Sequence, residues 1–175
     1  MAASLDNNVV TMKGGYDASH PIHMGGFTIT DAHPEGRWLS VPEIFAYSSN
    51  VGTAKMALDL GGKRQQKFLK SLGLFEPVKL ELSELGRPMI PRSWSELTTM
   101  TVAYGHGISV SPLHLINAIA AVSGDGVLHP MTLVKGGNAN KSEGTRVIAK
   151  KTVGDVRDLL RLVVLHGTGK SANAE

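Results

Sequence analysis

The sequence contains no cysteine, and this absence excludes disulfide bonds, thiolate metal ligands and thiol nucleophiles together. Aromatic residues make up only 5% of the 175 residues, whereas 42% are hydrophobic, so the expected core is mainly aliphatic. No run of about 18 apolar residues occurs, and the first six residues are too polar for a secretion signal. We therefore expect a soluble chain, of the length of one domain, with no membrane segment of its own.

Clustered positive charge is also missing. The formal net charge is +3, and the lysines and arginines are scattered along the chain. A surface that binds nucleic acid needs cations gathered on one face, so we expect no nucleic-acid partner. The sequence also shows no internal repeat and no low-complexity linker.

The hydrophobic pattern predicts a mostly helical body with one or two small hairpins. Residues 27–30 are the best strand candidate, and 127–134 are a second extended candidate. Prolines mark 74–92 as a surface connection, and polar residues mark 136–144 as a flexible loop. Helical segments are expected within 1–12 and at 40–47, 50–60, 63–72, 93–104, 111–123 and 152–165.

Several of these helices carry recognisable start signals. Ser40 and Glu43 have the spacing of a capping box, and so do Ser93 and Glu96. Pro112 stands in the first turn of the helix at 111–123, where its missing amide hydrogen does no harm. The helix at 152–165 shows the clearest apolar stripe, which predicts a structural role for it.

Ser48 and Asn50 lie two residues apart at a predicted break between two helices. If Ser49 turns away, both side chains can face one cleft. A hydroxyl there can relay a proton, and a carboxamide can donate to a carbonyl while it accepts from an amine. The structural alternative is that Ser48 and Asn50 only cap the helix that follows, at about 1 kcal/mol each.

Ser48 and Asn50 belong to one of four sequence blocks that occur in a fixed order. The blocks are Leu39-Ser40-Val41-Pro42-Glu43-Ile44, Ser48-Ser49-Asn50-Val51-Gly52, Tyr104-Gly105-His106-Gly107-Ile108-Ser109-Val110-Ser111-Pro112-Leu113 and Gly126-Val127-Leu128-His129-Pro130. Blocks of this kind in this order resemble the class B, division-type penicillin-binding proteins. The resemblance covers nearly the whole chain and implies a mainly α structure with small β hairpins, the helical middle portion of the penicillin-binding transpeptidase and serine β-lactamase-like α/β fold.

Two further motifs of that family do not occur in the sequence. A Ser-x-x-Lys motif carries the nucleophile and a Lys-Thr-Gly strand lines the other side of the site. No lysine here has a serine three residues before it, and Thr132 before Lys135 is the nearest match. Lys151-Thr152-Val153 lacks the glycine. The resemblance therefore implies that 1–175 is a partial transpeptidase domain lying between the two motifs.

The resemblance also implies functions for individual residues and for the parent protein. Ser48 would relay protons, Asn50 would position substrate, and Tyr104 and Gly105 would support the substrate side of the cleft. The parent would cross-link stem peptides ending in D-Ala-D-Ala during septal wall synthesis, and β-lactams would acylate it. It would act with division proteins at the periplasmic face of a bacterial inner membrane. It would need no cofactor or metal.

This chain alone would be inactive, and its uncovered apolar faces would favour a homodimer. Two alternatives remain open at this stage. The chain could be a non-catalytic interaction module that kept the fold, or a relative of β-lactam sensors and β-lactamases.

Other residue groups carry weaker signals. Lys55 could act as a catalytic lysine, but a helical lysine with its charge in solvent explains it better. His106 could act as a general base, but a structural turn between two glycines explains it better. The Gly-Lys-Ser at 169–171 lacks the upstream glycine of a phosphate-binding loop and follows a helix. Three histidines near the expected hairpin have no acidic or cysteine partner at ligand spacing, so no metal site is expected from His20, His23 and His33.

Overall fold

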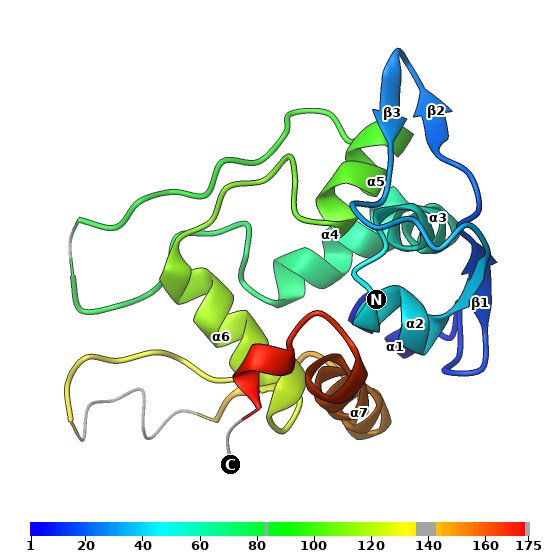
Figure 1. Cartoon of the computed structure of the whole chain (residues 1–175). Coiled ribbons are helices and arrows are strands. Elements are labelled where there is room, and N and C mark those ends of the chain that lie inside the picture. The colour runs from blue at the N-terminus through cyan, green and yellow to red at the C-terminus, as the bar shows by residue number, and fades with distance from the viewer. Residues whose placement is uncertain (83, 136–142, 174–175) are drawn as a thin grey trace.

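The structure is a computed structural model that describes residues 1–82, 84–135 and 143–173 (Figure 1). Helices dominate it, as the sequence predicts. The helices are α1 (Ala2–Asp6), α2 (Val41–Ala46), α3 (Asn50–Leu60), α4 (Gly62–Ser71), α5 (Glu96–Ala103), α6 (Pro112–Ser123), α7 (Lys150–His166) and the 3-10 turn η2 (Lys170–Ala172). The strands are β1 (Gly15–Asp17), β2 (Ile22–Met24), β3 (Phe27–Ile29), β4 (Trp38–Ser40), β5 (Val127–Leu128) and β6 (Thr145–Arg146).

The strands form three separate antiparallel pairs, β1 with β4, β2 with β3, and β5 with β6. The predicted hairpin around 27–30 is confirmed as β2–β3, in which Met24 lies opposite Phe27. Its two-residue turn is Gly25-Gly26, and both glycines have positive φ, as such tight turns require. The extended segment expected at 127–134 is confirmed only for β5. The predicted loop at 136–144 lies mostly outside the described residues.

The start of α2 follows the sequence prediction. The Ser40 hydroxyl accepts a hydrogen bond from the Glu43 amide, and the Glu43 carboxylate accepts one from the Ser40 amide at 2.9 Å. Arg37 lies 2.9 Å from the same carboxylate. These contacts hold the pKa of Glu43 at about 2, mainly through the hydrogen bond from Arg37 and then those from Ser40.

The predicted start of α5 is wrong by two residues. Ser95, not Ser93, caps this helix, and its hydroxyl accepts from the Thr98 amide at 3.1 Å. Trp94 explains the shift, because its indole N–H donates to Gln65 at 3.0 Å and its ring packs on Phe75. The chain therefore enters the helix only after Trp94 has been placed against α4.

The first helix is shorter than the 1–12 segment that the sequence suggests. α1 ends at Asp6, whose carboxylate accepts hydrogen bonds from the Ala149 amide and the Thr152 hydroxyl, both at 2.9 Å. This carboxylate from a distant segment caps α7, which begins at Lys150 rather than at Thr152. Asn8 then turns the chain with a φ of 54°.

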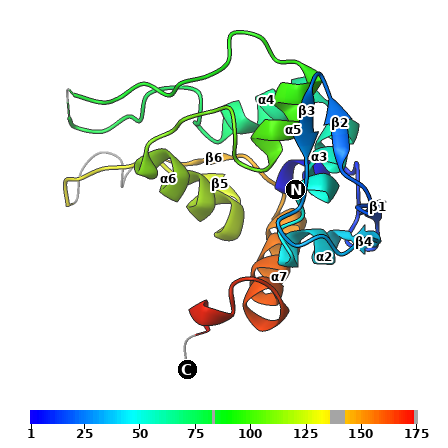
Figure 2. The same ribbon diagram turned by 45° about the horizontal axis from the view of Figure 1, so that its top comes forward.

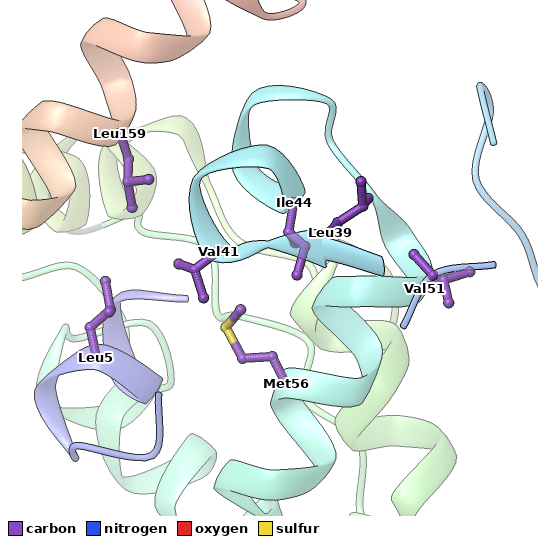
Figure 3. Close-up of a cluster of buried hydrophobic side chains, with 8 residues drawn as sticks. Leu5, Leu39, Val41, Ile44, Val51, Met56 and Leu159 are labelled. Atoms are coloured by element: carbon purple, nitrogen blue, oxygen red, sulfur yellow. The ribbon is translucent and has the colours of Figure 1, made fainter. Parts of the chain in front are cut away.

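The main core lies where α1, α2, α3 and α7 meet (Figure 3). Side chains from α2 and α3 converge there, and Leu159 approaches from α7. The junction between α2 and α3 is therefore built on a packed base. The cluster consists of Leu5, Ala18, Leu39, Val41, Ile44, Val51, Met56 and Leu159.

The helices α6 and α7 leave apolar side chains in solvent. The hairpin β2–β3 and α6 lie on opposite sides of the chain (Figures 1 and 2). On α6, Ile116 is 62% exposed and Ile119 is 49% exposed, and on α7 Leu160 is 41% exposed. The uncovered apolar faces that the sequence analysis expects thus lie on these two helices. Within the described residues, none of the helices is long and apolar enough to cross a bilayer.

Candidate active site

A pocket of about 410 Å³ opens at the junction between α2 and α3. Ser48, Asn50 and Tyr104, three of the four residues expected at the site, line it together. Gly105, the fourth, does not belong to the lining. The other lining residues are Met1, Ile44, Phe45, Ser49, Thr53, Ala103, Leu160 and Val163.

Ser48 occupies the turn that ends α2. The Ser49 amide donates to the Ile44 carbonyl at 2.9 Å and the Ser48 amide donates to the Phe45 carbonyl at 3.2 Å. This pair of bonds is the Schellman motif, in which the residue at the position of Ser48 is left-handed and is usually glycine. Ser48 has a φ of 56°, so a serine holds a conformation that disfavours side chains.

Ser49 faces away from solvent and caps α3. Only 2% of Ser49 is exposed, and its hydroxyl accepts from the Gly52 amide at 3.0 Å while it donates to Asp31 at 2.7 Å. The alternative in which Ser48 and Asn50 cap α3 is therefore wrong, because Ser49 is the cap and Asn50 is the first residue of the helix. Ser48 and Asn50 are therefore not needed as caps, and both line the pocket.

The Ser48 hydroxyl lies beside the segment that follows α7. Its Oγ is 3.4 Å from Thr168 Oγ1, and the Thr168 amide donates to the Ala46 carbonyl at 3.2 Å. Gly167 makes this approach possible, since a Cβ there would lie 2.4 Å from the Ala46 oxygen. A second hydroxyl thus stands next to Ser48.

The Asn50 side chain is oriented by the backbone after β3. Its Nδ2 donates to the Thr30 carbonyl at 2.8 Å. A carbonyl only accepts, so this bond fixes which end of the amide is the nitrogen. Within the described chain, no group donates to Asn50 Oδ1. An acceptor and one N–H remain for a ligand.

Tyr104, directly after α5, lines the pocket, and the ring of His106 packs against it from outside the lining. Their rings pack with centroids 5.3 Å apart. Burial raises the pKa of the Tyr104 phenol above its ordinary value, so the hydroxyl stays protonated at neutral pH. Gly105 has a φ of 97° and turns the chain after Tyr104. Apolar contributions come from Leu160 and Val163 of α7.

The weaker sequence candidates lie away from this pocket or have ordinary contacts. The Lys55 ammonium donates to the Asp17 carbonyl at 2.6 Å. His23 pairs with Thr28 across the β2–β3 hairpin at 3.0 Å. The Gly-Lys-Ser segment enters the short turn η2 after α7. Among the described residues, no group of three or more side chains could hold a metal ion.

Sequence reasoning missed two contributors to the site, Asp31 and Thr168. Asp31 contacts Ser49 from 18 positions away, and Thr168 contacts Ser48 from 120 positions away. No local pattern signals either contact. The hairpin predicted just before Asp31 was the nearest available clue.

The sequence matches one known protein family and resembles several of its members. The family described as penicillin binding protein transpeptidase domain matches residues 1–175. The chain is 37% identical over 171 residues to a probable peptidoglycan D,D-transpeptidase FtsI of Caulobacter vibrioides, covering 98% of this chain and 29% of that protein.

Solved structures agree in fold. A peptidoglycan glycosyltransferase from Burkholderia ambifaria superposes with a TM-score of 0.91 at 28% identity, over 99% of this chain and 56% of that one. The TP domain of penicillin-binding protein 3 from Burkholderia pseudomallei gives a TM-score of 0.88 at 28% identity, over 99% and 53%. The chain spans about three tenths of the length of the curated relatives it matches.

Proposed function

The chain belongs to the penicillin-binding protein transpeptidase domain family, and we propose that it supplies one wall of a peptidoglycan D,D-transpeptidase site. The observation that carries this proposal is the shared pocket of Ser48 and Asn50, with Ser49 turned into the fold. A hydroxyl and a carboxamide thereby face one space.

The proposed reaction is acyl transfer through a serine ester. A serine of a Ser-x-x-Lys motif attacks the carbonyl between the two D-Ala residues of a stem peptide, and the terminal D-Ala leaves with the proton of that serine. An amine of a neighbouring strand then attacks the ester and releases the serine. The sequence holds no Ser-x-x-Lys and no Lys-Thr-Gly, so a complete site needs both from another segment.

Ser48 suits proton transfer in this scheme. Its hydroxyl is exposed at the pocket and can accept a proton from one partner while it donates its own to another. Thr168, with its Oγ1 3.4 Å away, extends this chain of hydroxyls. Asn50 suits substrate positioning, because its free Oδ1 accepts from a peptide N–H and its remaining N–H donates to a carbonyl.

The proposed cellular role of the complete protein rests on the same relatives. The 37% identity to a protein named FtsI supports a division role, in which the complete protein works on septal peptidoglycan with division proteins as partners. We place that protein at the periplasmic face of the bacterial inner membrane. β-Lactams, which resemble the acylating end of the stem peptide, would acylate its serine.

For the chain by itself, we propose inactivity and self-association through α6 and α7. One alternative from the sequence is a non-catalytic interaction module of the same fold. A β-lactam sensor or β-lactamase relative is the other alternative from the sequence, and no contact among the described residues favours it.

Labelling with a fluorescent penicillin tests the proposal. The chain alone should gain no covalent adduct. A chimera in which residues 1–175 replace the matching segment of the Caulobacter relative should be labelled, because that relative is similar over 98% of the chain. In the chimera, Ser48→Ala should slow acylation about a hundredfold.

The control is folding of each protein, followed by its thermal unfolding. A folded chimera that takes no label would overturn the proposal and favour the non-catalytic module. A stoichiometric adduct on the chain alone would also overturn it, since the nucleophile would then be one of its own residues.

A further inference from the structure

Asp31 caps helix α3 from outside the helix. One carboxylate oxygen accepts from the Ser49 hydroxyl at 2.7 Å, and the other accepts from the Val51 amide at 2.9 Å. Hydrogen bonds to a carboxylate are stronger than those to a neutral acceptor. The first turn of α3 contains no acidic residue, so Asp31 brings the negative charge that the positive end of a helix favours.

The segment that carries Asp31 is itself anchored. Ile29 of β3 is 5% exposed and packs with Ala54 of α3 and Met100 of α5. Thr30 follows, and its carbonyl accepts from Asn50 Nδ2. Two consecutive residues after β3 therefore hold both the start of α3 and the amide group that faces the pocket.

From this geometry we infer that Asp31 is a positioning residue, which sets the direction of the Ser48 and Asn50 side chains through Ser49. Removing the carboxylate leaves the buried Ser49 hydroxyl without its acceptor and the Val51 amide without its partner. The turn then loses the bond that ties Ser49 to the segment after β3, and Asn50 loses its fixed separation from Thr30. The catalytic consequence rests on the proposed function, whereas the structural consequence does not.

The chain offers a matched control in Asp6. This carboxylate also comes from a distant segment, and it also accepts from one amide and one hydroxyl at the start of a helix. The helix is α7, and Asp6 does not line the pocket at Ser48. Asp6→Ala and Asp31→Ala therefore remove the same kind of cap at two different places.

The first test uses nuclear magnetic resonance on the full chain. In Asp31→Ala, solvent exchange of the Asn50 side-chain amide should speed up about tenfold or more, and its two proton signals should move toward those of a free amide. In Asp6→Ala these signals should stay unchanged, although unfolding occurs at lower urea. If Asp31→Ala leaves the Asn50 signals in place, or if Asp6→Ala moves them equally, the inference is overturned. Should Asp31→Ala fail to fold, Asp31→Asn carries the same comparison.

The second test uses the chimera and saturating fluorescent penicillin. Asp31→Ala should lower the limiting acylation rate by ten- to a hundredfold, which is about what a displacement near 1 Å costs a catalytic group. Asp6→Ala should leave the rate within about twofold at a temperature where both variants are folded. Equal rates in the two variants would overturn the positioning role. An unreactive parent chimera would instead count against the proposed function, and the resonance test would still decide whether Asp31 orients Asn50.

Discussion

The hydroxyl oxygens of Ser48 and Thr168 lie 3.4 Å apart although 120 positions separate them in the sequence. The contact depends on the bond from the Thr168 amide to the Ala46 carbonyl, the last residue of α2. The end of α7 and the turn after α2 therefore form one local structure. A substitution at the end of α7 should therefore alter the turn after α2, and the reverse should also hold.

Gly167→Ala tests this connection. The new Cβ would meet the Ala46 oxygen at 2.4 Å, which is backbone and cannot rotate away, so the segment after α7 has to shift. We expect a loss of about 1–3 kcal/mol in the free energy of unfolding, measured by urea denaturation. The Thr168 amide should also exchange faster with solvent.

The control for that variant is Gly154→Ala. Gly154 lies within α7, and an added Cβ there meets nothing within 4 Å. Alanine favours a helix over glycine by about 1 kcal/mol, so this variant should be more stable than the parent chain. Gly154→Ala should thus raise the free energy of unfolding, whereas Gly167→Ala should lower it. A stabilised Gly167→Ala variant would show that the segment is not clamped on α2.

Ser48→Gly should stabilise the chain by about 0.5–1 kcal/mol. The φ of 56° disfavours serine and suits glycine, and the hydroxyl that is lost is exposed. Ser48→Ala keeps the unfavourable conformation and should be no more stable than the parent. In the chimera both variants should acylate slowly, because both lack the hydroxyl. If Ser48→Gly is less stable than Ser48→Ala, the strain argument fails.

Glu43 should make the stability of the chain depend on acid pH. Folding lowers its pKa from 4.5 to about 2, so its charge stabilises the native state above about pH 4.5. This contribution is lost as the pH falls through that interval toward 2. Glu43→Gln keeps a capping side chain and removes only the charge. We expect it to cost about 1 kcal/mol at pH 7.

Urea denaturation of both forms at pH 7 and near pH 2 checks this prediction. The difference in unfolding free energy should shrink as the pH falls, because Glu43 of the parent becomes neutral. Glu35→Gln is the control, since Glu35 lies 3.6 Å from the same Arg37 guanidinium but does not cap the helix. A difference that stays constant with pH would refute a role for the charge.

Self-association of the chain should depend on the exposed face of α6. Soluble monomers rarely expose large apolar patches, and Ile116 and Ile119 are both exposed, one helical turn apart on α6. Replacing both by glutamate should lower the scattering mass at high concentration without a loss of stability, since both are largely exposed. Phe27→Glu, at the exposed hairpin turn, serves as the control and should leave association unchanged. A parent chain that remains monomeric over the concentration range would contradict the prediction.

Local signals in the sequence account for much of the fold. The capping box at Ser40, the hairpin around 27–30 and the helix end at Leu60 all rest on contacts between close neighbours, and the structure has them as predicted. Ser93 fails as a cap because a tertiary contact of Trp94 overrides the local pattern. Propensity and spacing do not encode such contacts.

The candidate site also combines residues that local sequence signals reveal with residues that only tertiary contacts bring in. Ser48 and Asn50 could be singled out from their spacing, and in the structure they line one pocket together with Tyr104. Asp31 and Thr168 could not, because each meets the site only after distant segments have packed. The capping alternative named Ser48 and Asn50 rather than Ser49 for a related reason. The orientation of Ser49 follows from the left-handed turn at Ser48, which the sequence does not reveal.

The cap that Asp6 places on α7 also bears on how the chain folds during synthesis. Its bonds close loops of 143 and 146 residues, and Leu5 and Leu159 share one core cluster. Although α1 also packs on α3 and α4, its contacts with α7 cannot form until Leu159 has left the ribosome. Contacts this distant in sequence slow folding and expose apolar segments meanwhile. Early helices of this protein should thus depend on chaperones or on transient local contacts until α7 emerges.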